Sequence, residues 1–360
     1  MTRLVRVVRL ARAPIFQQLC IEEALFYKTD GNWCLYNEGC PTEPPTVVLG
    51  ISGKPERMCN LDAVRRDGIP LIRRFSGGGT VIVDQGTIFA TLIMKQGDVP
   101  ECQPYPRDIM SWTEKIYGPA FSRLVDRPDA TRLSLRENDY VFGDLKFGGN
   151  AQAITRDRWL HHTSFLWSFD PRNMSYLRIP DRMPEYRNGR DHAGFLTTLD
   201  AHIGSRGGGN LGSESSGGSG SDGGGKSGSS GGGGITGRRS GGGSSGGGSS
   251  NGGASSSSSG GGSRDAIYGE VVAALRETFR VEETPLLEVA AVVDELGGMA
   301  AWMRACRTRF VGADGAGLVA AAAARLHGHA DAWRRNGSAD SGGGGDGSEI
   351  SGRKCAAITV

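Results

Sequence analysis

The stretch that decides the fold is IRRFSGGGTVIVDQGT, residues 72–87. Two arginines, Arg73 and Arg74, precede three consecutive glycines at residues 77–79. Because glycine has no Cβ, such a turn can adopt positive φ angles and let its N–H groups approach a carboxylate or a phosphate. The β-branched run after the glycines is typical of a strand. The pattern therefore predicts a glycine turn between two strands, with arginine charge beside an anion site.

The spacing of these glycines excludes two common phosphate loops. A P-loop needs G-x-x-x-x-G-K-[ST] at the start of a helix, and a dinucleotide fold needs G-x-G-x-x-G; residues 72–87 contain neither. A glycine hairpin whose arginines face solvent is the alternative interpretation. The three glycines alone do not decide between an anion site and that hairpin.

Composition indicates how much of the chain can fold and in which cellular compartment it lies. The 360 residues include 58 glycines and carry a formal net charge of only +2, which gives no argument for a nucleic acid or a membrane surface as the main partner. Seven scattered cysteines without a C-x-x-C motif argue against a zinc site and a disulfide framework. No apolar run approaches the ~20 residues of a membrane span. We expect a protein that is not secreted, in the cytoplasm or in a mitochondrial or plastid matrix.

Hydrophobic patterning predicts strands mixed with helices before a Gly/Ser tract, and helices after it. Strands are predicted at residues 4–10, 46–51, 69–74, 80–84 and 88–95, and three more within residues 138–167, separated by turns at Gly143-Asp144 and Arg156-Asp157. Helices are predicted at residues 16–28, 61–66, 109–124, 264–279, 284–296, 300–309 and 318–335, the second capped by Asn60. We expect residues 80–84 to be the return partner of residues 69–74. Arginines at positions 3, 6, 9 and 12 resemble a transit peptide in charge, but their alternation with apolar residues favours the strand.

Lys146 is the second candidate for chemistry. It follows the predicted Gly143-Asp144 turn and precedes Gly148 and Gly149, which leave the backbone open on the side that the lysine can reach. A lysine that merely extends from an apolar hairpin to solvent is the alternative.

Two adjacent histidines follow in the same stretch. His161 and His162 face opposite sides of a strand, so they cannot both bind one metal as an i, i+4 pair on a helix does. Structural hydrogen bonding is the alternative to a functional role for either histidine.

Three motifs, in order, resemble the biotin/lipoate A/B protein ligase family, and most closely its lipoate-protein ligases of the plant type. They are RRFSGGGTV at residues 73–81, KFGGNAQ at residues 146–152 and LHHT at residues 160–163. The sequence LCIEEAL at residues 19–25 is similar to an early helix of the family, and residues 184–199 look like a Tyr-Arg-x-x-Arg-x-His segment of the plant-type members. The resemblance implies an α/β (α+β) fold with a largely antiparallel sheet flanked by helices.

The resemblance also implies a reaction. A lipoate ligase condenses lipoate with ATP to an acyl-adenylate and then transfers the lipoyl group to a lysine of an acceptor domain, in a 2-oxoacid dehydrogenase complex or in the glycine cleavage H protein. Lys146 would be the catalytic residue, as the charge that polarises the acyl carbonyl, and Asp139 would bind Mg²⁺. The residues implied in binding lipoate and ATP are Arg73, Arg74, Ser76, Gly77, Gly78, Gly79, Asp84, Asn138, Asp139, Gly149, Asn150, Ala151, His161 and His162. We expect a monomer.

The expected domain organisation follows from the same resemblance and from composition. Residues 3–203 and 264–284 would form one catalytic domain, interrupted by a disordered Gly/Ser-rich insertion at residues 204–263. Residues 285–335 would be a helical C-terminal extension, and residues 336–360 a flexible tail.

Departures from the family pattern keep other functions open. Val83 stands where many relatives have histidine, Gly149-Asn150 replaces a glycine-serine pair, and residues 282–335 are short for the accessory domain of bacterial ligases. A transferase that uses a pre-activated donor is therefore an alternative. One that carries the acyl group on cysteine is disfavoured because no cysteine lies between Cys102 and Cys306. Biotin ligation is disfavoured because the sequence lacks the Gly-Arg-Gly-Arg-x-Gly-Arg loop of biotin ligases. A non-catalytic lipoyl-binding protein is the alternative from another functional class.

Overall fold

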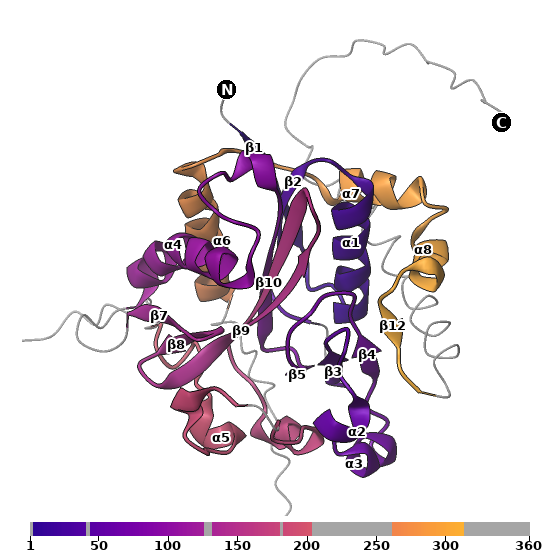
Figure 1. Cartoon of the computed structure of the whole chain (residues 1–360), viewed down its shortest axis with the longest axis vertical. Coiled ribbons are helices and arrows are strands. Elements are labelled where there is room, and N and C mark those ends of the chain that lie inside the picture. The colour runs from indigo at the N-terminus through magenta and orange to yellow at the C-terminus, as the bar shows by residue number, and fades with distance from the viewer. Residues whose placement is uncertain (1–2, 41–43, 126–131, 181–182, 204–260, 313–360) are drawn as a thin grey trace, which may run out of the picture. The chain divides into compact units, whose positions relative to one another are not determined.

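The structure is a computed structural model that describes residues 3–40, 44–125, 132–180, 183–203 and 261–312. Its centre is an eight-stranded mixed sheet with helices on both faces (Figure 1). In spatial order the strands are β11 (Arg280–Glu283), β1 (Leu4–Leu10), β2 (Asn32–Asn37), β6 (Thr87–Lys95), β10 (Arg158–Leu166), β9 (Leu145–Ile154), β8 (Asp139–Phe142) and β7 (Leu133–Arg136). From β2 to β7 every pairing is antiparallel, whereas β1 runs parallel to β2 and β11. The predicted α/β class with a largely antiparallel sheet is confirmed.

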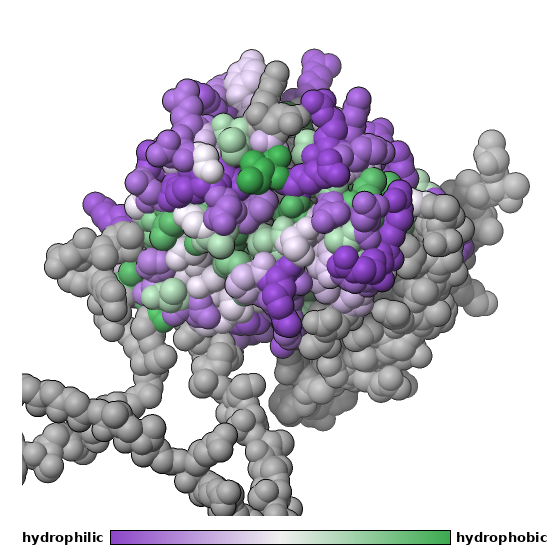
Figure 2. All heavy atoms as spheres, turned by 90° about the horizontal axis from the view of Figure 1, so that it is seen from below, coloured by the Kyte–Doolittle hydropathy of each residue, from purple (hydrophilic) through white to green (hydrophobic). Residues whose placement is uncertain are grey.

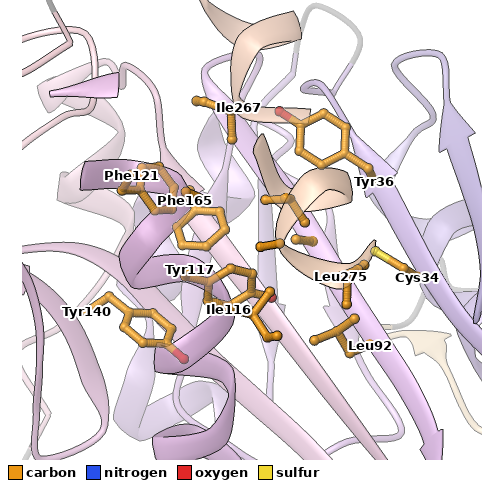
Figure 3. Packing of buried hydrophobic residues seen from close by; sticks show 14 of the residues in the cluster. Cys34, Tyr36, Leu92, Ile116, Tyr117, Phe121, Tyr140, Phe165, Ile267 and Leu275 are labelled. Carbon is orange, nitrogen blue, oxygen red and sulfur yellow. The ribbon is translucent and has the colours of Figure 1, made fainter. Parts of the chain in front are cut away.

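One face of this sheet is covered by α4 (Pro106–Leu124) and α6 (Gly261–Arg276). Figure 3 shows Tyr117 and Phe121 of α4 and Leu275 of α6 packed over Phe165 and Leu92 of the sheet. These side chains are almost completely buried. The face removes several aromatic rings from water, and their burial is a large stabilising contribution to the fold.

The opposite face is covered by α1 (Ile15–Lys28) and α7 (Leu286–Asp294). Leu25 and Phe26 of α1 pack with Ile93 and Leu160 of the central strands, and Val289 of α7 joins the same cluster. Successive strand residues point to opposite faces, so continuous apolar runs such as Thr87–Lys95 fill both layers. That two-sided burial explains why the strongest strand signals in the sequence belong to the central strands.

A second sheet has four strands and contains one correction to the sequence prediction. Its order is β12 (Arg309–Phe310), β4 (Leu71–Arg73), β3 (Thr46–Leu49) and β5 (Val81–Val83). The predicted pairing of β4 with β5 is wrong, because β3 lies between them, parallel to β4 and antiparallel to β5. The connection from Arg74 to Thr80 is long enough to cross the end of β3, so a tight hairpin does not form.

Short helices and C-terminal elements complete the described fold. They are α2 (Pro55–Met58), α3 (Leu61–Arg66), η1 (Gln96–Asp98), η2 (Pro171–Tyr176), η3 (Glu185–Arg187), α5 (His192–Phe195) and α8 (Met299–Ala305). The predicted cap of α3 is confirmed, since Asn60 Oδ1 accepts a hydrogen bond from Ala63 N. The helix predicted at residues 318–335 and the tract at residues 204–260 lie outside the described residues. Among those described, no helix has the length and apolar character to cross a membrane.

A buried carboxylate helps to attach the C-terminal elements to α1 and to the small sheet. Glu23 of α1 accepts hydrogen bonds from Arg307 N (2.7 Å), Thr308 N (2.9 Å) and Thr308 Oγ1 (2.8 Å). These two residues connect α8 to β12, which pairs with β4. Glu23 thus fixes the strand that covers the edge of the small sheet.

We expect Glu23→Ala to destabilise the protein because it leaves buried N–H donors without an acceptor. The loss should be about 2–3 kcal/mol, which lowers Tm by roughly 5–10 °C for a domain of this size. Thermal unfolding followed by circular dichroism measures it. Glu288→Ala, at an exposed position on α7, is the matched control, and an equal fall in Tm for both variants would contradict the role of Glu23.

We propose that the predicted insertion lies within one domain and ends at residue 260 instead of 263, because beyond it α6 packs on the central sheet and β11 pairs with β1. Since α6 begins at Gly261, the deletion to make is residues 205–260, joined by a short flexible linker. Because the tract is almost entirely Gly and Ser, it has too few apolar residues to form a core, so Tm should change by less than about 3 °C. A fall above about 10 °C would contradict the proposal.

Candidate active site

The glycine loop, residues 76–79, follows β4 and is shaped by the buried side chain of Arg74. Arg74 Nη2 donates to Gly77 O (2.9 Å) and Gly79 O (2.8 Å), and Nη1 lies 3.4 Å from Val48 O. Burial lowers the pKa of Arg74 to about 10, an effect that the nearby carboxylate of Glu22 opposes. The guanidinium therefore stays charged at neutral pH and turns the loop carbonyls toward itself. Its predicted contact with a carboxylate or phosphate stays a prediction.

Arg73 points away from Arg74 and binds a different segment. Its Nη1 donates to Gly53 O (2.5 Å) and Ile51 O (3.2 Å), in the turn that follows β3. Ile51 N in turn donates to Ser76 O, so this turn and the glycine loop support each other. The side chain of Ile51 is 49% exposed, which places an apolar group beside the loop. Figure 2, which views the molecule from below Figure 1, shows apolar and hydrophilic residues side by side on the face turned to the viewer.

Two glycines are required where the loop crosses its neighbours. A Cβ on Gly50 would lie 2.2 Å from Gly78 O, so the end of β3 passes the loop with no room for a side chain. Gly78 has a φ of +104°, and a Cβ there would lie 2.9 Å from Asn150 O. Sequence reasoning identified Gly78 but missed Gly50, whose signal was a glycine directly after the apolar run of β3.

The glycine loop rests on β9, the strand that also carries Lys146. Gly77 N donates to Gln152 O (2.7 Å), and Gly78 packs on Asn150 and Ala151. The structure therefore brings together the first two sequence motifs, which lie about seventy residues apart in the chain.

A β-bulge directs Lys146 into this site. Gly149 pairs with Asp139 and Lys146 with Val141, which leaves Phe147 as the extra residue of β9. The bulge puts Lys146, Gly149 and Asp139 on one face of the hairpin, while Phe147 enters the core. Lys146 Nζ lies 2.7 Å from Asp139 Oδ1, and a Cβ on Gly149 would lie 3.3 Å from that same nitrogen. The side chain of Lys146 is 24% exposed, so this lysine is partly buried and lies neither on the open surface nor in the core.

Asp139 uses both carboxylate oxygens within the chain. Oδ1 holds Lys146, and Oδ2 accepts a hydrogen bond from the hydroxyl of Tyr186 (2.8 Å). This donor set fits a counter-ion for lysine better than a Mg²⁺ ligand, so we derive no step through a metal at Asp139. Among the described residues, no group of three His, Cys, Asp or Glu side chains could hold a metal ion.

The two histidines lie on opposite faces of β10, as predicted, and both are buried. Gln152 Nε2 contacts His161 Nδ1 (3.0 Å), and Thr113 Oγ1 lies 3.3 Å from His161 Nε2. Burial and the neighbouring His162 lower the pKa of His161 to about 3, so its ring is neutral. His162 Nδ1 lies 2.9 Å from Glu22 Oε1. Both rings are bonded within the chain, which favours structural hydrogen bonding over direct contact with substrate.

The remaining predicted residues are also bonded to the chain. Asp84 accepts hydrogen bonds from Gly86 N (3.0 Å) and Asp170 N (3.1 Å), as a turn-forming aspartate does. Asn150 Nδ2 donates to Asn138 O (2.9 Å), so Asn138 contributes its backbone rather than its side chain to this contact. Contact of these residues with lipoate or ATP stays a prediction. Sequence reasoning also missed Glu22 and Tyr186, to which it assigned no role although both lie in motifs that it quoted.

A sequence profile of known proteins decides the family. The profile of the lipoyl protein ligase A/B catalytic domain matches residues 15–202, more than half of the chain. The chain belongs to this family. The match begins at α1 and ends before α6, so it contains the glycine loop, Lys146 and both histidines.

Three curated proteins are similar to parts of the chain. Inactive lipoate–protein ligase 2 of Plasmodium falciparum is 25% identical over 244 residues, covering 53% of this chain and 62% of that protein. Lipoate-protein ligase A of Blochmanniella floridana is 29% identical over 174 residues and 45% of each chain. A mitochondrial lipoyl amidotransferase of Homo sapiens is 31% identical over 133 residues, covering 37% and 33%. The chain thus spans less than two thirds of each of these relatives.

Solved structures resemble the fold at low sequence identity. A lipoate-protein ligase A bound with ATP superposes with a TM-score of 0.49 at 15% identity, covering 82% of this chain and 94% of the other. A lipoate protein ligase of T. acidophilum with bound lipoic acid has a TM-score of 0.49 at 14% identity, with the same coverage.

We expect Gly78→Ala to distort the glycine loop. Its positive φ and the contact of the added Cβ with Arg74 Nη2 at 2.8 Å should cost about 1–3 kcal/mol. Gly79→Ala is the matched control, because no heavy atom lies within 4 Å of a Cβ there. Urea unfolding of the two variants measures the difference, and equal stability would contradict this account of the loop.

Proposed function

We propose that the chain is a lipoate–protein ligase that makes lipoyl-adenylate from lipoate and ATP and transfers the lipoyl group to a lysine of a lipoyl-acceptor domain. The observation that carries the proposal is the arrangement on β9. The glycine loop rests on one part of the strand, and the bulge directs the Lys146 ammonium over Gly149 further along it. Loop N–H groups and an aimed cation are what both half-reactions need.

In the first half-reaction a lipoate carboxylate oxygen attacks the α-phosphorus of ATP and pyrophosphate leaves. Negative charge gathers on phosphoryl oxygens, and positioned donors stabilise it without reorganisation. In the proposal the glycine-loop N–H groups other than that of Gly77, which donates to Gln152 O, supply those donors, and Arg74 holds the loop in shape. Magnesium enters with ATP as part of the substrate.

In the second half-reaction the acceptor amine attacks the acyl carbon, the acyl–phosphate bond breaks, and AMP leaves. The carbonyl oxygen becomes negative as the tetrahedral centre forms. Lys146 would leave Asp139 and bind that oxygen as a compact cation. The exposed apolar side chain of Ile51 suits the carbon chain of lipoate.

A cysteine-based acyl transfer is the alternative that the thiols argue against. Burial raises the pKa of Cys34, Cys40 and Cys102 to about 12 and that of Cys59 to about 11. The pKa of Cys20 is raised well above its usual value, also by burial. A thiolate is the nucleophile in such enzymes, and these sites oppose its formation. Cys355 lies outside the described residues.

A lipoyl-binding protein without activity is the second candidate, because one relative is named inactive. The assay that separates the candidates combines the purified chain with lipoate, ATP and Mg²⁺, with and without an apo lipoyl domain. The ligase releases pyrophosphate and adds one lipoyl group to the domain, measured by intact mass. Transfer only from preformed lipoyl-adenylate would indicate a transferase. Binding of lipoate without either product would indicate the binding protein.

We expect Lys146→Ala to lower transfer from preformed lipoyl-adenylate by about 10²-fold or more, since an aimed charge in a water-poor site contributes ~3 kcal/mol. Lys146→Arg should also fail, because a planar guanidinium cannot place its charge where the ammonium was. Single-turnover rates measure both effects.

Two controls belong to this experiment. Lys115→Ala, on the exposed side of α4, should transfer at the wild-type rate, and Cys102→Ala should stay within a factor of about two to three. If Lys146→Ala kept the wild-type rate while Cys102→Ala lost it, the thioester route would replace the ligase assignment.

A further inference from the structure

The carboxylate of Asp139 is shared between two parts of the chain that are distant in sequence. One oxygen holds Lys146 from the neighbouring strand, and the other accepts the hydroxyl of Tyr186 from η3. Only 6% of Asp139 is exposed, so water competes little for either oxygen. A buried carboxylate in this position orients whatever it binds.

Tyr186 is held in place without its bond to Asp139. Its ring packs on Phe195 with centroids 5.2 Å apart, and the guanidinium of Arg136 lies 4.8 Å from its ring centroid. Arg190 Nη2 donates to Tyr186 O (2.8 Å) and to Asp144 O (2.9 Å), which ties η3 to the turn of the lysine hairpin. Removing the hydroxyl alone therefore leaves the ring and the segment where they are.

The hydroxyl acts on Asp139 as a donor only. Burial and the adjacent Asp139 raise the pKa of Tyr186 well above its usual range, so the phenol keeps its proton. A hydrogen bond from a neutral donor spreads the negative charge of the carboxylate and fixes its rotation. When the Tyr186 hydroxyl is removed, the buried Oδ2 of Asp139 loses this donor and can turn toward the ammonium of Lys146.

We propose that Tyr186 is a positioning residue that sets how firmly Asp139 holds Lys146. With the hydroxyl in place, Oδ1 alone holds the ammonium over Gly149, and Lys146 can leave Asp139 when negative charge develops on the acyl oxygen. Without the hydroxyl, both oxygens of Asp139 bind the ammonium, and Lys146 leaves Asp139 less readily for the acyl oxygen. This inference rests on the proposed function of Lys146 in acyl transfer and adds a residue that controls it.

The first test is Tyr186→Phe in single-turnover transfer from preformed lipoyl-adenylate to an apo lipoyl domain. The rate constant should fall roughly tenfold, the size expected for losing a hydrogen bond to a charged group, while the KM for lipoyl-adenylate stays within a factor of about two. Tyr105→Phe, at a tyrosine that is 64% exposed before α4, is the matched control and should match wild type. Thermal unfolding should place Tyr105→Phe within about 2 °C of wild type and Tyr186→Phe within about 5 °C, because ring packing is retained and one hydrogen bond is lost.

A double-mutant cycle separates positioning from a general structural effect. In a Lys146→Ala background, Tyr186→Phe should cause no further loss of the residual rate, because the hydroxyl acts only through that lysine. A tenfold loss in both backgrounds would overturn the proposal.

A second measurement does not depend on catalysis. Acetylation of Lys146 by an N-hydroxysuccinimide ester, followed by peptide mass spectrometry, should be at least about threefold slower in Tyr186→Phe than in wild type, with Lys115 as internal reference. If wild type transfers no lipoyl group, the proposed function fails and this labelling still decides the role of Tyr186. An unchanged labelling rate at Lys146 would overturn the inference whether or not the chain is a ligase.

Discussion

The site depends on one buried cation, the guanidinium of Arg74. Burying a charge is costly unless hydrogen bonds and an opposite charge compensate for the lost water. Here the carbonyls of Gly77 and Gly79 supply the hydrogen bonds, and the carboxylate of Glu22 supplies the charge. The glycine loop therefore adopts the conformation that provides hydrogen-bond acceptors for Arg74. Because the carbonyls of Gly77 and Gly79 face the guanidinium, the N–H groups of the loop can bond to β9 or to a ligand.

Glu22 extends this dependence to the central sheet. The same carboxylate contacts His162 of β10 and accepts a hydrogen bond from Thr91 of β6 at 2.7 Å. A helix that supplies the counter-charge for the loop is thus bonded to the two central strands. Displacing α1 would disturb Arg74, the glycine loop and β10 together, which explains why a charged residue is buried between α1 and the sheet.

Much of this could be predicted from local sequence pattern, because pattern carries local information. The Asn60 cap and the three strands around Lys146 are formed largely by contacts between near neighbours, and both are confirmed. The strand at residues 4–10 is also confirmed, although its partners β2 and β11 were not predicted. The pairing of β4 with β5 was wrong because strand order depends on packing across distant segments. The contact of Tyr186 with Asp139 joins residues 47 positions apart, and no periodicity in the sequence signals it.

Arg73 and Arg74 are an instructive intermediate case. Both were placed at the predicted anion site from the sequence, but β4 ends at Arg73, so strand alternation does not decide where Arg74 points. The structure directs the two side chains to different segments, Arg74 to the carbonyls of the glycine loop and Arg73 to the turn after β3.

The helix α1 also joins the site to a part of the chain outside the family match. Consecutive helix residues point about 100° apart, so Glu22 and Glu23 face different neighbours from the same turn. Glu22 supports the glycine loop and His162, whereas Glu23 holds the residues that lead into β12. Since β12 pairs with β4, and β4 ends at Arg73, the C-terminal elements contact the strand that leads into the loop. The segment after residue 261 therefore supports the geometry of the site through two contacts, one with helix α1 and one with β4 at the edge of the small sheet.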